Sequence, residues 1–384
     1  MKVANIVGAR PQFIKYFPIM KALRRTNAPG NEAIEDLLVH TGQHYDYAMS
    51  RSFFDEFSLK EPDHHLNVGS GSHGFQTSEI MKRLEPVLQN ERPDVVVVYG
   101  DTNSTLAAAL TASKLHLPVA HIEAGLRSFN KGMPEEINRV LTDHISTLLF
   151  CPSKAAVENL KKEGVRHATI DGDLIDLHDR QDESAQVSID SPGVCNVGDV
   201  MYDVLLQAAS LAATRSTIMQ QMDLSPGEFC LLTIHRAEST DSPADFARLV
   251  HFVNEATAGM RTVMPMHPRT RKIYEHSTAK FEANVAVTEP VGYFDMVALI
   301  RRSALVLTDS GGMQKEAYWL KVPCVTLRRE TEWIETVASG WNVLYEDYTG
   351  SHRADREYPA CYGDGQAAPR IVRIIGDTFG RTPE

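Results

Sequence analysis

The sequence has few cysteines, no excess of basic residues and no long hydrophobic run. Its five cysteines are scattered and form no Cys-x-x-Cys pair, so neither a disulfide framework nor a thiolate zinc site is indicated. The formal net charge of -11 argues against a nucleic-acid partner, which would need a basic surface. Apolar runs such as Val95–Tyr99 are far shorter than the roughly 20 residues of a membrane span. Because Met1–Gly8 also does not suit a signal peptide, we expect a reducing, cytoplasmic location.

Two common nucleotide-binding motifs are missing as well. No Gly-x-x-x-x-Gly-Lys string occurs, which argues against a P-loop nucleotidase. No Gly-x-Gly-x-x-Gly follows the first strand-like run, Val3–Val7, so a dinucleotide cofactor has no support. The 384 residues, 43% of them hydrophobic and 23% charged, are those of an ordinary globular protein. At roughly 100–200 residues per domain, we expect two domains.

Short β-branched runs alternate with helical patterns along the chain, which predicts βαβ units and parallel sheets. The predicted strands, five in each half, are Val3–Val7, Leu37–Thr41, Asp94–Tyr99, Pro118–Ile122, Leu148–Cys151, Phe229–Ile234, Arg261–Met266, Val285–Thr288, Leu305–Thr308 and Pro323–Leu327. The predicted fold class is therefore α/β, with two doubly wound, Rossmann-like domains. We see no internal repeat in the sequence itself.

We place the first domain at residues 1–193 and the second at residues 194–365. A last helical pattern, within residues 366–384, is expected to pack back on the first domain. The segment Val165–Gly193 holds seven Asp and Glu residues between positions 171 and 190, with little apolar periodicity. Such a composition is typical of a solvated surface loop or linker, and we assign it no function.

Small polar clusters follow nearly every predicted strand. They are Gly8-Ala9-Arg10, Thr41-Gly42-Gln43-His44, Gly100-Asp101-Thr102, His121-Ile122-Glu123-Ala124-Gly125, His235-Arg236, His267-Pro268-Arg269 and Asp309-Ser310-Gly311-Gly312. Any one of them could be ordinary turn chemistry. Because ligands of open α/β sheets bind outside the carboxyl ends of the strands, the set together favours a site between two facing sheets.

The string Asp309-Ser310-Gly311-Gly312 is the sharpest single motif. It follows an apolar strand and opens a predicted helix, Met313–Leu320. Two glycines let backbone N–H groups approach a ligand, and the start of a helix carries partial positive charge, so phosphate is the natural guest. Glu316, about one turn into the helix, could accept hydrogen bonds from the hydroxyl groups of a ribose. The alternative is an ordinary helix cap made by Ser310 or Asp309.

The strand-end loops also carry candidate acid–base groups. Carboxylates from three loops of the first half (Asp101, Glu123, and Glu135 with Glu136) suit proton transfer at a carbon atom if they converge. Glu135 and Arg139 lie four residues apart on one helix, so a local ion pair is the alternative. His235 and His267 follow strands of the second half, where each is either a proton carrier or a structural histidine bonded to nearby backbone.

Cations and possible metal ligands are less decisive. Arg10, Lys15, Arg236 and Arg269 could offset the charge of an anionic ligand, or could simply be solvated. His121 and Glu123 share one face of a strand, but no spacing fixes a third ligand. We therefore predict no metal site.

In these motifs the chain resembles the non-hydrolysing UDP-N-acetylglucosamine 2-epimerase family. The matching strings, in the order of the family, are Gly8-Ala9-Arg10-Pro11, Thr41-Gly42-Gln43-His44, Gly100-Asp101-Thr102, Glu123-Ala124-Gly125-Leu126-Arg127, Pro134-Glu135-Glu136-Ile137-Asn138-Arg139, Asn196-Val197-Gly198-Asp199, Thr233-Ile234-His235-Arg236, His267-Pro268 and Asp309-Ser310-Gly311-Gly312-Met313-Gln314-Lys315-Glu316. The resemblance covers most of the chain, and the set is specific although each string alone is weak.

The resemblance implies a glycosyltransferase-B fold, in which the second domain binds UDP and the cleft between the domains holds a UDP-sugar. It implies catalytic roles for Asp101, Glu123, Glu135 and His235. The implied substrate-binding residues are Arg10, Lys15, Arg139, His267, Ser310, Gly311, Gly312 and Glu316, and His235 would also contact UDP. The implied reaction is epimerisation at C2 by elimination and re-addition of UDP, with no cofactor, and the implied assembly is a homodimer.

Two departures from the family pattern leave the sugar open. Trp333 stands where the family often has Arg, and Lys315 stands where Glu is common. The tryptophan variant is similar to relatives that act on UDP-2,3-diacetamido-glucuronic acid. A hydrolysing 2-epimerase, a glycosyltransferase of the same fold and a non-enzymatic UDP-sugar sensor are the alternative functions.

Overall fold

The computed structural model describes residues 1–26, 34–43, 60–165, 187–240, 242–331, 333–350 and 358–380. It contains two compact units, one formed by Met1–Val204 with Cys361–Glu384 and the other by Leu205–Ala360. The chain thus leaves the first unit once and returns to it at the C-terminal end. His44, Glu332 and most of the acidic segment 165–193 lie outside the described residues.

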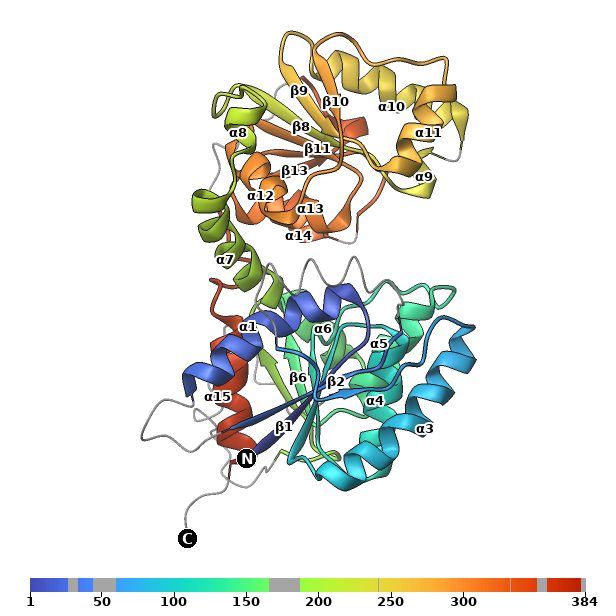
Figure 1. The fold of residues 1–384 in the computed structure, drawn as a ribbon, viewed down its shortest axis with the longest axis vertical. Helices are drawn as coiled ribbons and strands as arrows, with labels where there is room; N and C mark the ends of the chain where they lie inside the picture. The colour runs from blue at the N-terminus through green and yellow to red at the C-terminus, as the bar shows by residue number, and fades with distance from the viewer. Residues whose placement is uncertain are drawn as a thin grey trace. The chain divides into compact units, whose positions relative to one another are not determined.

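Each unit holds one parallel sheet with helices against it (Figure 1). The strand order is β3-β2-β1-β4-β5-β6-β7 in the first unit and β10-β9-β8-β11-β12-β13 in the second. Counted within each unit, both orders begin 3-2-1-4-5-6, which is the Rossmann order of nucleotide-binding folds. The described chain therefore carries the same topology twice, and the predicted fold class of two Rossmann-like units is confirmed.

The first unit is built from the following elements. Its strands are β1 (Lys2–Val7), β2 (Glu35–His40), β3 (His64–His65), β4 (Val95–Tyr99), β5 (Val119–Ile122), β6 (Leu148–Cys151) and β7 (Gly193–Asn196). Its helices are α1 (Arg10–Thr26), α3 (His73–Glu91), α4 (Asn103–Lys114), α5 (Pro134–His144), α6 (Lys154–Lys162) and α15 (Ala367–Phe379). Helix α7 (Val200–Arg215) starts in this unit and continues into the second, so the division after Val204 falls within a helix.

The second unit repeats the alternation of strand and helix. Its strands are β8 (Phe229–Thr233), β9 (Arg261–Pro265), β10 (Val285–Thr288), β11 (Leu305–Thr308), β12 (Cys324–Thr326) and β13 (Asn342–Leu344). Its helices are α8 (Ile218–Gln221), α9 (Ala237–Thr240), α10 (Pro243–Ala256), α11 (Pro268–His276), α12 (Tyr293–Arg302), α13 (Gly311–Trp319) and α14 (Ile334–Ala338), with a 3-10 turn at Tyr345–Asp347.

All ten predicted strands are present, but the expectation of five strands in each half was wrong. The described chain adds β3, β7 and β13, which have only two, four and three residues. Strand β3, with two residues, has too few side chains to show an alternating pattern, whereas β7 is as long as the predicted β6 and β13 is as long as the predicted β12, so length alone does not explain why these two were missed. They form because an existing sheet offers them hydrogen-bonding partners, as β6 does for β7 in the pairing of Leu148 with Gly193.

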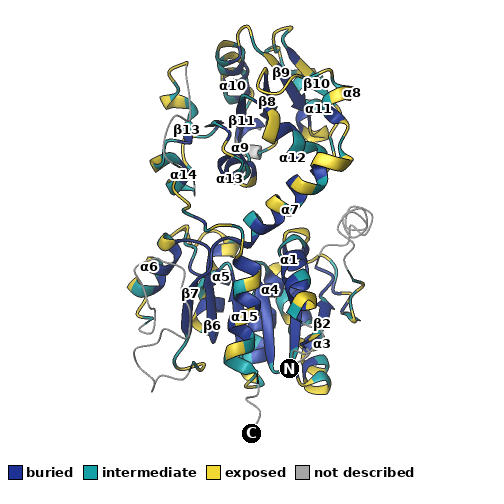
Figure 2. Cartoon of the chain, turned by 90° about the vertical axis from the view of Figure 1, so that its left-hand side faces the viewer, coloured by how far each residue is buried: buried dark blue, intermediate teal, exposed yellow. Residues whose placement is uncertain are grey.

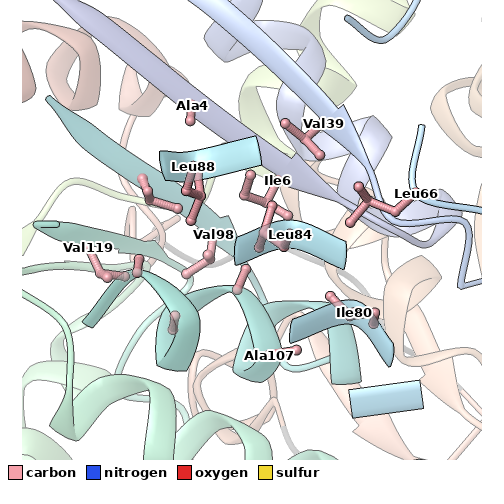
Figure 3. Packing of buried hydrophobic residues seen from close by; sticks show 14 of the residues in the cluster. Ala4, Ile6, Val39, Leu66, Ile80, Leu84, Leu88, Val98, Ala107 and Val119 are labelled. Carbon is pink, nitrogen blue, oxygen red and sulfur yellow. The ribbon is translucent and has the colours of Figure 1, made fainter. Parts of the chain in front are cut away.

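The core of the first unit lies between its sheet and helices α3 and α4. Because successive side chains of a strand point to opposite faces, Ala4 and Ile6 of β1 face the same cluster as Val98 of β4. Leu84 and Leu88 of α3 pack against them (Figure 3). Helix α4 contributes alanines, whose small side chains let its backbone approach the sheet closely.

The opposite face of this sheet also carries a buried polar network. The hydroxyl group of Tyr99 donates a hydrogen bond to Oδ1 of Asn5 (2.6 Å), and Nδ2 of Asn5 donates to Asp36 (2.9 Å). The hydroxyl group of Tyr16, from α1, donates to the other oxygen of Asp36 (2.6 Å). Helix α1 therefore lies on the face of the sheet away from α3 and α4.

In the second unit, both faces of the sheet are covered by apolar clusters. Cys230 and Leu232 of β8 pack with Phe246 of α10, whereas Phe229 and Leu231 pack with residues of α12 and α13. Figure 2 shows the resulting buried strands inside each unit. None of the helices in the described ranges is long and apolar enough to cross a membrane.

Candidate functional site

The polar clusters fall at the carboxyl ends of strands next to the reversal of strand order in each sheet. In the first unit, Arg10 follows β1 and Asp101 follows β4, which are adjacent strands. In the second unit, His235 follows β8 and Ser310 follows β11, which are also adjacent. In open α/β sheets this reversal point is where ligands bind, so each unit presents its own set of candidate groups.

The turn after β1 is closed by Gln12 rather than left open for an anion. Oε1 of Gln12 accepts hydrogen bonds from the backbone N–H groups of Gly8 (2.7 Å) and Ala9 (3.0 Å). A side chain at position 8 would not fit, because a Cβ atom there would lie 2.1 Å from Oγ of Ser104. The backbone of this turn is thus occupied, and Arg10 begins α1 with an exposed side chain.

Lys15 and Glu123 form an ion pair in the first unit. Only 11% of the lysine side chain and 18% of the glutamate side chain are exposed, so water screens this pair weakly. Burial by itself would lower the pKa of Lys15, but Glu123, Asp101 and Asp199 together hold that pKa above its ordinary value. The ammonium group is therefore charged and directed at a candidate catalytic carboxylate.

The backbone of Glu123 is held in an unusual conformation. Its φ is +75°, in the left-handed region that side chains other than glycine rarely adopt. The N–H groups of Glu123 and Ala124 both donate to the carbonyl oxygen of Phe150 (3.1 Å each), which fixes this turn. Strained residues of this kind are concentrated at functional sites, which supports a role for Glu123 beyond packing.

Arg139 joins two acidic loops of the first unit. Its guanidinium forms ion pairs with Asp101 and with Glu136 (3.1 Å). The expected alternative, a local pair with Glu135, is therefore not what forms. Glu136 is buried and accepts bonds from the N–H groups of Ser128 and Phe129 (2.9 Å each), so its role is structural, whereas Glu135 is exposed in the first turn of α5.

Both ring nitrogens of His121 are engaged by protein atoms. Nδ1 lies 2.6 Å from the carboxylate of Asp143, and Nε2 lies 2.7 Å from the carbonyl oxygen of Gly100. No sequence pattern connects Asp143, on α5, with this strand, because only the tertiary structure brings them together. Within the described ranges, no group of three or more His, Cys, Asp or Glu residues is placed to hold a metal ion.

In the second unit, the buried carboxylate of Asp309 organises the loop after β8. It accepts hydrogen bonds from the backbone N–H groups of His235 (3.0 Å) and Arg236 (2.9 Å). Burial would raise the pKa of Asp309, but the bonds and charge of His235 and the amide of Arg236 hold that pKa below its ordinary value. Nδ1 of His235 lies 3.2 Å from the same carboxylate, so Nε2 is the ring nitrogen left for a ligand.

Helix α13 begins at the predicted anion site. Ser310 is its N-cap, and the serine hydroxyl accepts a bond from the N–H of Met313 (3.4 Å), as the capping alternative expected. A capped helix still has N–H groups in its first turn without acceptors in the helix, here those of Gly311 and Gly312. Capping and anion binding are thus compatible at this position.

Glu316 lies one turn further along α13. The hydroxyl group of Tyr293 donates a hydrogen bond to its Oε1 (3.1 Å). Burial raises the pKa of Glu316 to about 7, although Tyr293 and the neighbouring Lys315 oppose the rise. A ligand that brings hydroxyl donors to this carboxylate would replace lost water contacts, which is how a ribose would be recognised.

The remaining predicted residues differ in what the structure shows of them. His267 is the N-cap of α11, where its Nδ1 accepts a bond from the N–H of Arg269 (3.2 Å), so the structural alternative holds for that nitrogen. Lys15 and Arg139 both form ion pairs with carboxylates of the first unit.

The two residues that depart from the family pattern are in contact with each other. Nζ of Lys315 lies 3.8 Å from the ring centroid of Trp333. Such a contact between an ammonium group and an indole ring is attractive.

Comparison with known proteins agrees with this arrangement. The family model described as UDP-N-acetylglucosamine 2-epimerase matches residues 27–376. The chain is 44% identical to a UDP-N-acetylglucosamine 2-epimerase homolog of Methanococcus maripaludis, with 98% of this chain and 99% of that protein covered. It is 43% identical to the UDP-2,3-diacetamido-2,3-dideoxy-D-glucuronate 2-epimerase of Pseudomonas aeruginosa, with the same coverage of both.

A solved structure of a relative is similar to this chain in fold. The UDP-GlcNAc 2-epimerase of Methanocaldococcus jannaschii, solved in complex with UDP-GlcNAc and UDP, is 38% identical to this chain. The two structures align with a TM-score of 0.75 over 98% of this chain and 100% of the other. The resemblance inferred from the ordered motifs is confirmed, and the chain belongs to the UDP-N-acetylglucosamine 2-epimerase family.

Proposed function

We propose that this protein is an isomerase that inverts C2 of a UDP-linked 2-acetamido sugar. The observation that carries the proposal is the placement of Asp101 and Glu123 directly after the adjacent strands β4 and β5. Each carboxylate is paired with a cation, Asp101 with Arg139 and Glu123 with Lys15. A reaction that removes a proton from one face of a carbon and returns it to the other needs two such groups.

The second unit supplies all the proposed groups for UDP except Arg10, which lies in the first unit. In the proposal, the first-turn amides of α13 at Gly311 and Gly312 receive the diphosphate, with Ser310, and Glu316 receives the ribose. Arg10 and His235 add donors toward the same anion, and His267 lines the site. The roles of these residues rest on strand-end position and chemistry, together with the family's motif order.

The proposed reaction has two steps, elimination of UDP and its re-addition. A carboxylate takes the proton from C2, the C1–O bond to UDP breaks with its electron pair leaving on UDP, and a C1–C2 double bond forms. An acid then protonates C2 on the opposite face, and the UDP oxygen re-forms the bond to C1. The candidates for the two proton transfers are Asp101, Glu123, Glu135 and His235. UDP and the unsaturated sugar must both stay bound between the two steps, because a released intermediate would be lost to water.

The proposal is tested by incubating the protein with UDP-N-acetylglucosamine in D₂O and following the sugar by proton NMR. Deuterium at C2 and a UDP-linked manno product are expected. Free sugar together with UDP would instead show a hydrolysing enzyme. If no deuterium enters, UDP-2,3-diacetamido-glucuronate is used next, since the Pseudomonas relative is named for it. Absence of exchange with both sugars would contradict the proposal.

The proposal also includes a homodimer, which the family resemblance implies, in the cytoplasm and with no nucleic-acid or membrane partner, as expected from the composition. Analytical ultracentrifugation of the purified protein tests the assembly, and a single species with the mass of one chain would contradict it. Fractionation of the source cells tests the location. Neither result affects the proposed reaction, which concerns the groups of one chain.

A further inference from the structure

We propose that Asp143, acting through His121 and supported by Arg127, is the positioning group that holds both candidate proton-transfer loops of the first unit. This inference rests on the proposed reaction, since the loops it concerns carry Asp101 and Glu123. Asp143 lies on α5 and is 3% exposed, and His121 lies on β5 and is fully buried. Neither side chain was given a catalytic or substrate-binding role from the sequence.

The carboxylate of Asp143 binds the Glu123 loop directly. Its Oδ2 accepts a hydrogen bond from the backbone N–H of Gly125 (3.0 Å), two residues after Glu123. The peptide group is planar, so fixing that N–H fixes the orientation of the whole Ala124–Gly125 unit. Together with the bonds from Glu123 and Ala124 to Phe150, this leaves the strained turn at Glu123 held on both sides.

The same carboxylate reaches the Asp101 loop through the imidazole of His121. Oδ1 of Asp143 lies 2.6 Å from Nδ1, and Nε2 donates to the carbonyl oxygen of Gly100 (2.7 Å). Gly100 has φ of +62° and directly precedes Asp101. Because the carbonyl of Gly100 shares a peptide plane with the N–H of Asp101, the imidazole sets the direction in which the Asp101 side chain leaves the backbone.

The hydrogen-bond pattern also fixes where hydrogens must be. A carbonyl oxygen only accepts, so Nε2 of His121 carries a hydrogen atom. A second hydrogen lies in the contact between Nδ1 and Asp143, whose two oxygens face three donors in all. Burial would raise the pKa of Asp143, but His121 and Arg127 hold that pKa below its ordinary value. An ionised carboxylate only accepts hydrogen bonds, so with Asp143 ionised the hydrogen of this contact lies on Nδ1.

Arg127 is the third side chain of this hydrogen-bond network. Its Nη1 donates to Oδ2 of Asp143 (2.7 Å) and to the carbonyl oxygen of Leu126 (2.7 Å). Its Nε and Nη2 form a bidentate pair with Glu163 (2.7 and 2.8 Å). Asp143 therefore lies between His121 and Arg127, and Arg127 is paired in turn with the exposed Glu163, so replacing Asp143 alone removes the carboxylate that both side chains contact.

The kinetic test uses Asp143→Asn, which keeps the shape of the side chain and removes its charge. We expect kcat for exchange of the C2 proton to fall about 100-fold, as a small misplacement of reacting groups commonly produces. KM and UDP affinity should change less than about threefold, since the proposed UDP groups other than Arg10 lie in the other unit, and Arg10 is on α1, outside the two loops that Asp143 holds. Asp143→Asn combined with His121→Gln should be no slower than the slower single variant, because the two side chains act as one unit.

A matched control exists in the same unit. His64 and Glu91 form another imidazole–carboxylate pair (2.8 Å), on β3 and at the end of α3, away from the strand-end loops. Glu91→Gln should leave kcat within about twofold of wild type. The proposal would be overturned if kcat fell equally in Glu91→Gln and Asp143→Asn, or if kcat of Asp143→Asn were unchanged.

A spectroscopic measurement on the wild-type protein tests the proposal even if Asp143→Asn does not fold. Protein labelled with ¹⁵N in its histidine rings is examined without substrate, and His121→Gln assigns the signals. We expect two protons on the His121 ring, one on Nδ1 at low field, and slow exchange of both with solvent. A ring with only one protonated nitrogen would overturn the proposal. Because no substrate is present, this result stands apart from any failure of the epimerase assay.

Discussion

At the scale of single residues, Glu123 combines the features expected of a catalytic group. It has a strained backbone, low exposure and a buried ammonium partner. We predict that Glu123→Gln lowers C2 proton exchange by about 10²–10⁴-fold, the usual effect of losing an acid–base group. UDP affinity, measured by calorimetry, should stay near that of wild type. Glu158→Gln, on the exposed surface of α6, is the control, and exchange at the wild-type rate in Glu123→Gln would remove Glu123 from the mechanism.

His235 is expected to act at the nucleotide instead. Its backbone and its Nδ1 are held by Asp309, while 44% of the side chain remains exposed. His235→Ala should weaken UDP binding by about 1.5–3 kcal/mol, the contribution of a hydrogen bond to a charged group. Titration calorimetry with UDP measures this directly. His251→Ala, on an exposed face of α10, serves for comparison, and equal affinities in the two variants would argue against contact between His235 and the diphosphate.

The raised pKa of Glu316 has a consequence for stability. The pKa of Glu316 is about 7 in the folded chain, against an ordinary value of 4.5, so between these pH values the folded state keeps a proton that the unfolded state releases. The free energy of unfolding therefore falls as pH rises through this window, by at most about 3 kcal/mol. Glu316→Gln should remove this dependence and be more stable than wild type at about pH 8.

Urea unfolding at about pH 5 and about pH 8 compares Glu316→Gln with wild type and with Glu228→Gln, an exposed control. The same stabilisation at both pH values would show that the effect of the substitution is unrelated to ionisation. UDP affinity of Glu316→Gln should fall, because an amide accepts fewer hydrogen bonds from a ribose than a carboxylate does. Stability and ligand recognition are thus opposed at this residue.

At the scale of elements, Gly8 sets how closely β1 approaches β2 and α4. A Cβ atom there would lie 2.1 Å from Oγ of Ser104 and 2.2 Å from Oγ1 of Thr41, two hydroxyl groups that are bonded to each other (2.8 Å). We predict that Gly8→Ala lowers the free energy of unfolding by about 1–3 kcal/mol through overpacking. Gly74→Ala, in α3 with nothing within 4 Å, should be neutral or stabilising by up to about 1 kcal/mol. Equal effects in the two variants, measured by thermal unfolding, would refute this explanation.

At the scale of the whole molecule, the first unit is made from both ends of the chain. Helix α15 packs against α1, and the N–H groups of Ala367 and Ala368 at its start donate to Asp203 of α7 (3.1 and 2.8 Å). We predict that removing residues 361–384 reduces hydrogen-exchange protection in β1 and α1. Protection in β8 and β11 should be unchanged, because α15 belongs to the first unit. Loss of protection in both units alike would contradict this division.

Most of the fold of this protein could be predicted from the sequence, because the local sequence signals agree with the tertiary structure. The β-branched runs, the glycines after strands and the helix starts at Ser310 and Thr102 are local features, since propensity and capping act over a few residues. The ordered strand-end motifs therefore predicted two Rossmann-like units, the family and the positions of the candidate residues. They did not reveal β3, β7 and β13, which exist only because a neighbouring strand pairs with them.

Only the tertiary structure decided which side chains meet. Arg139 pairs with Asp101, which is 38 positions away, and not with Glu135 on its own helix. Asp143 lies 22 positions from His121, and the contact of Lys315 with Trp333 joins two separate motifs. Such partners depend on how strands and helices pack, which no local propensity encodes. The sequence by itself determined which chemical groups stand at the strand ends, and the packing of the sheets determined their partners and charge states.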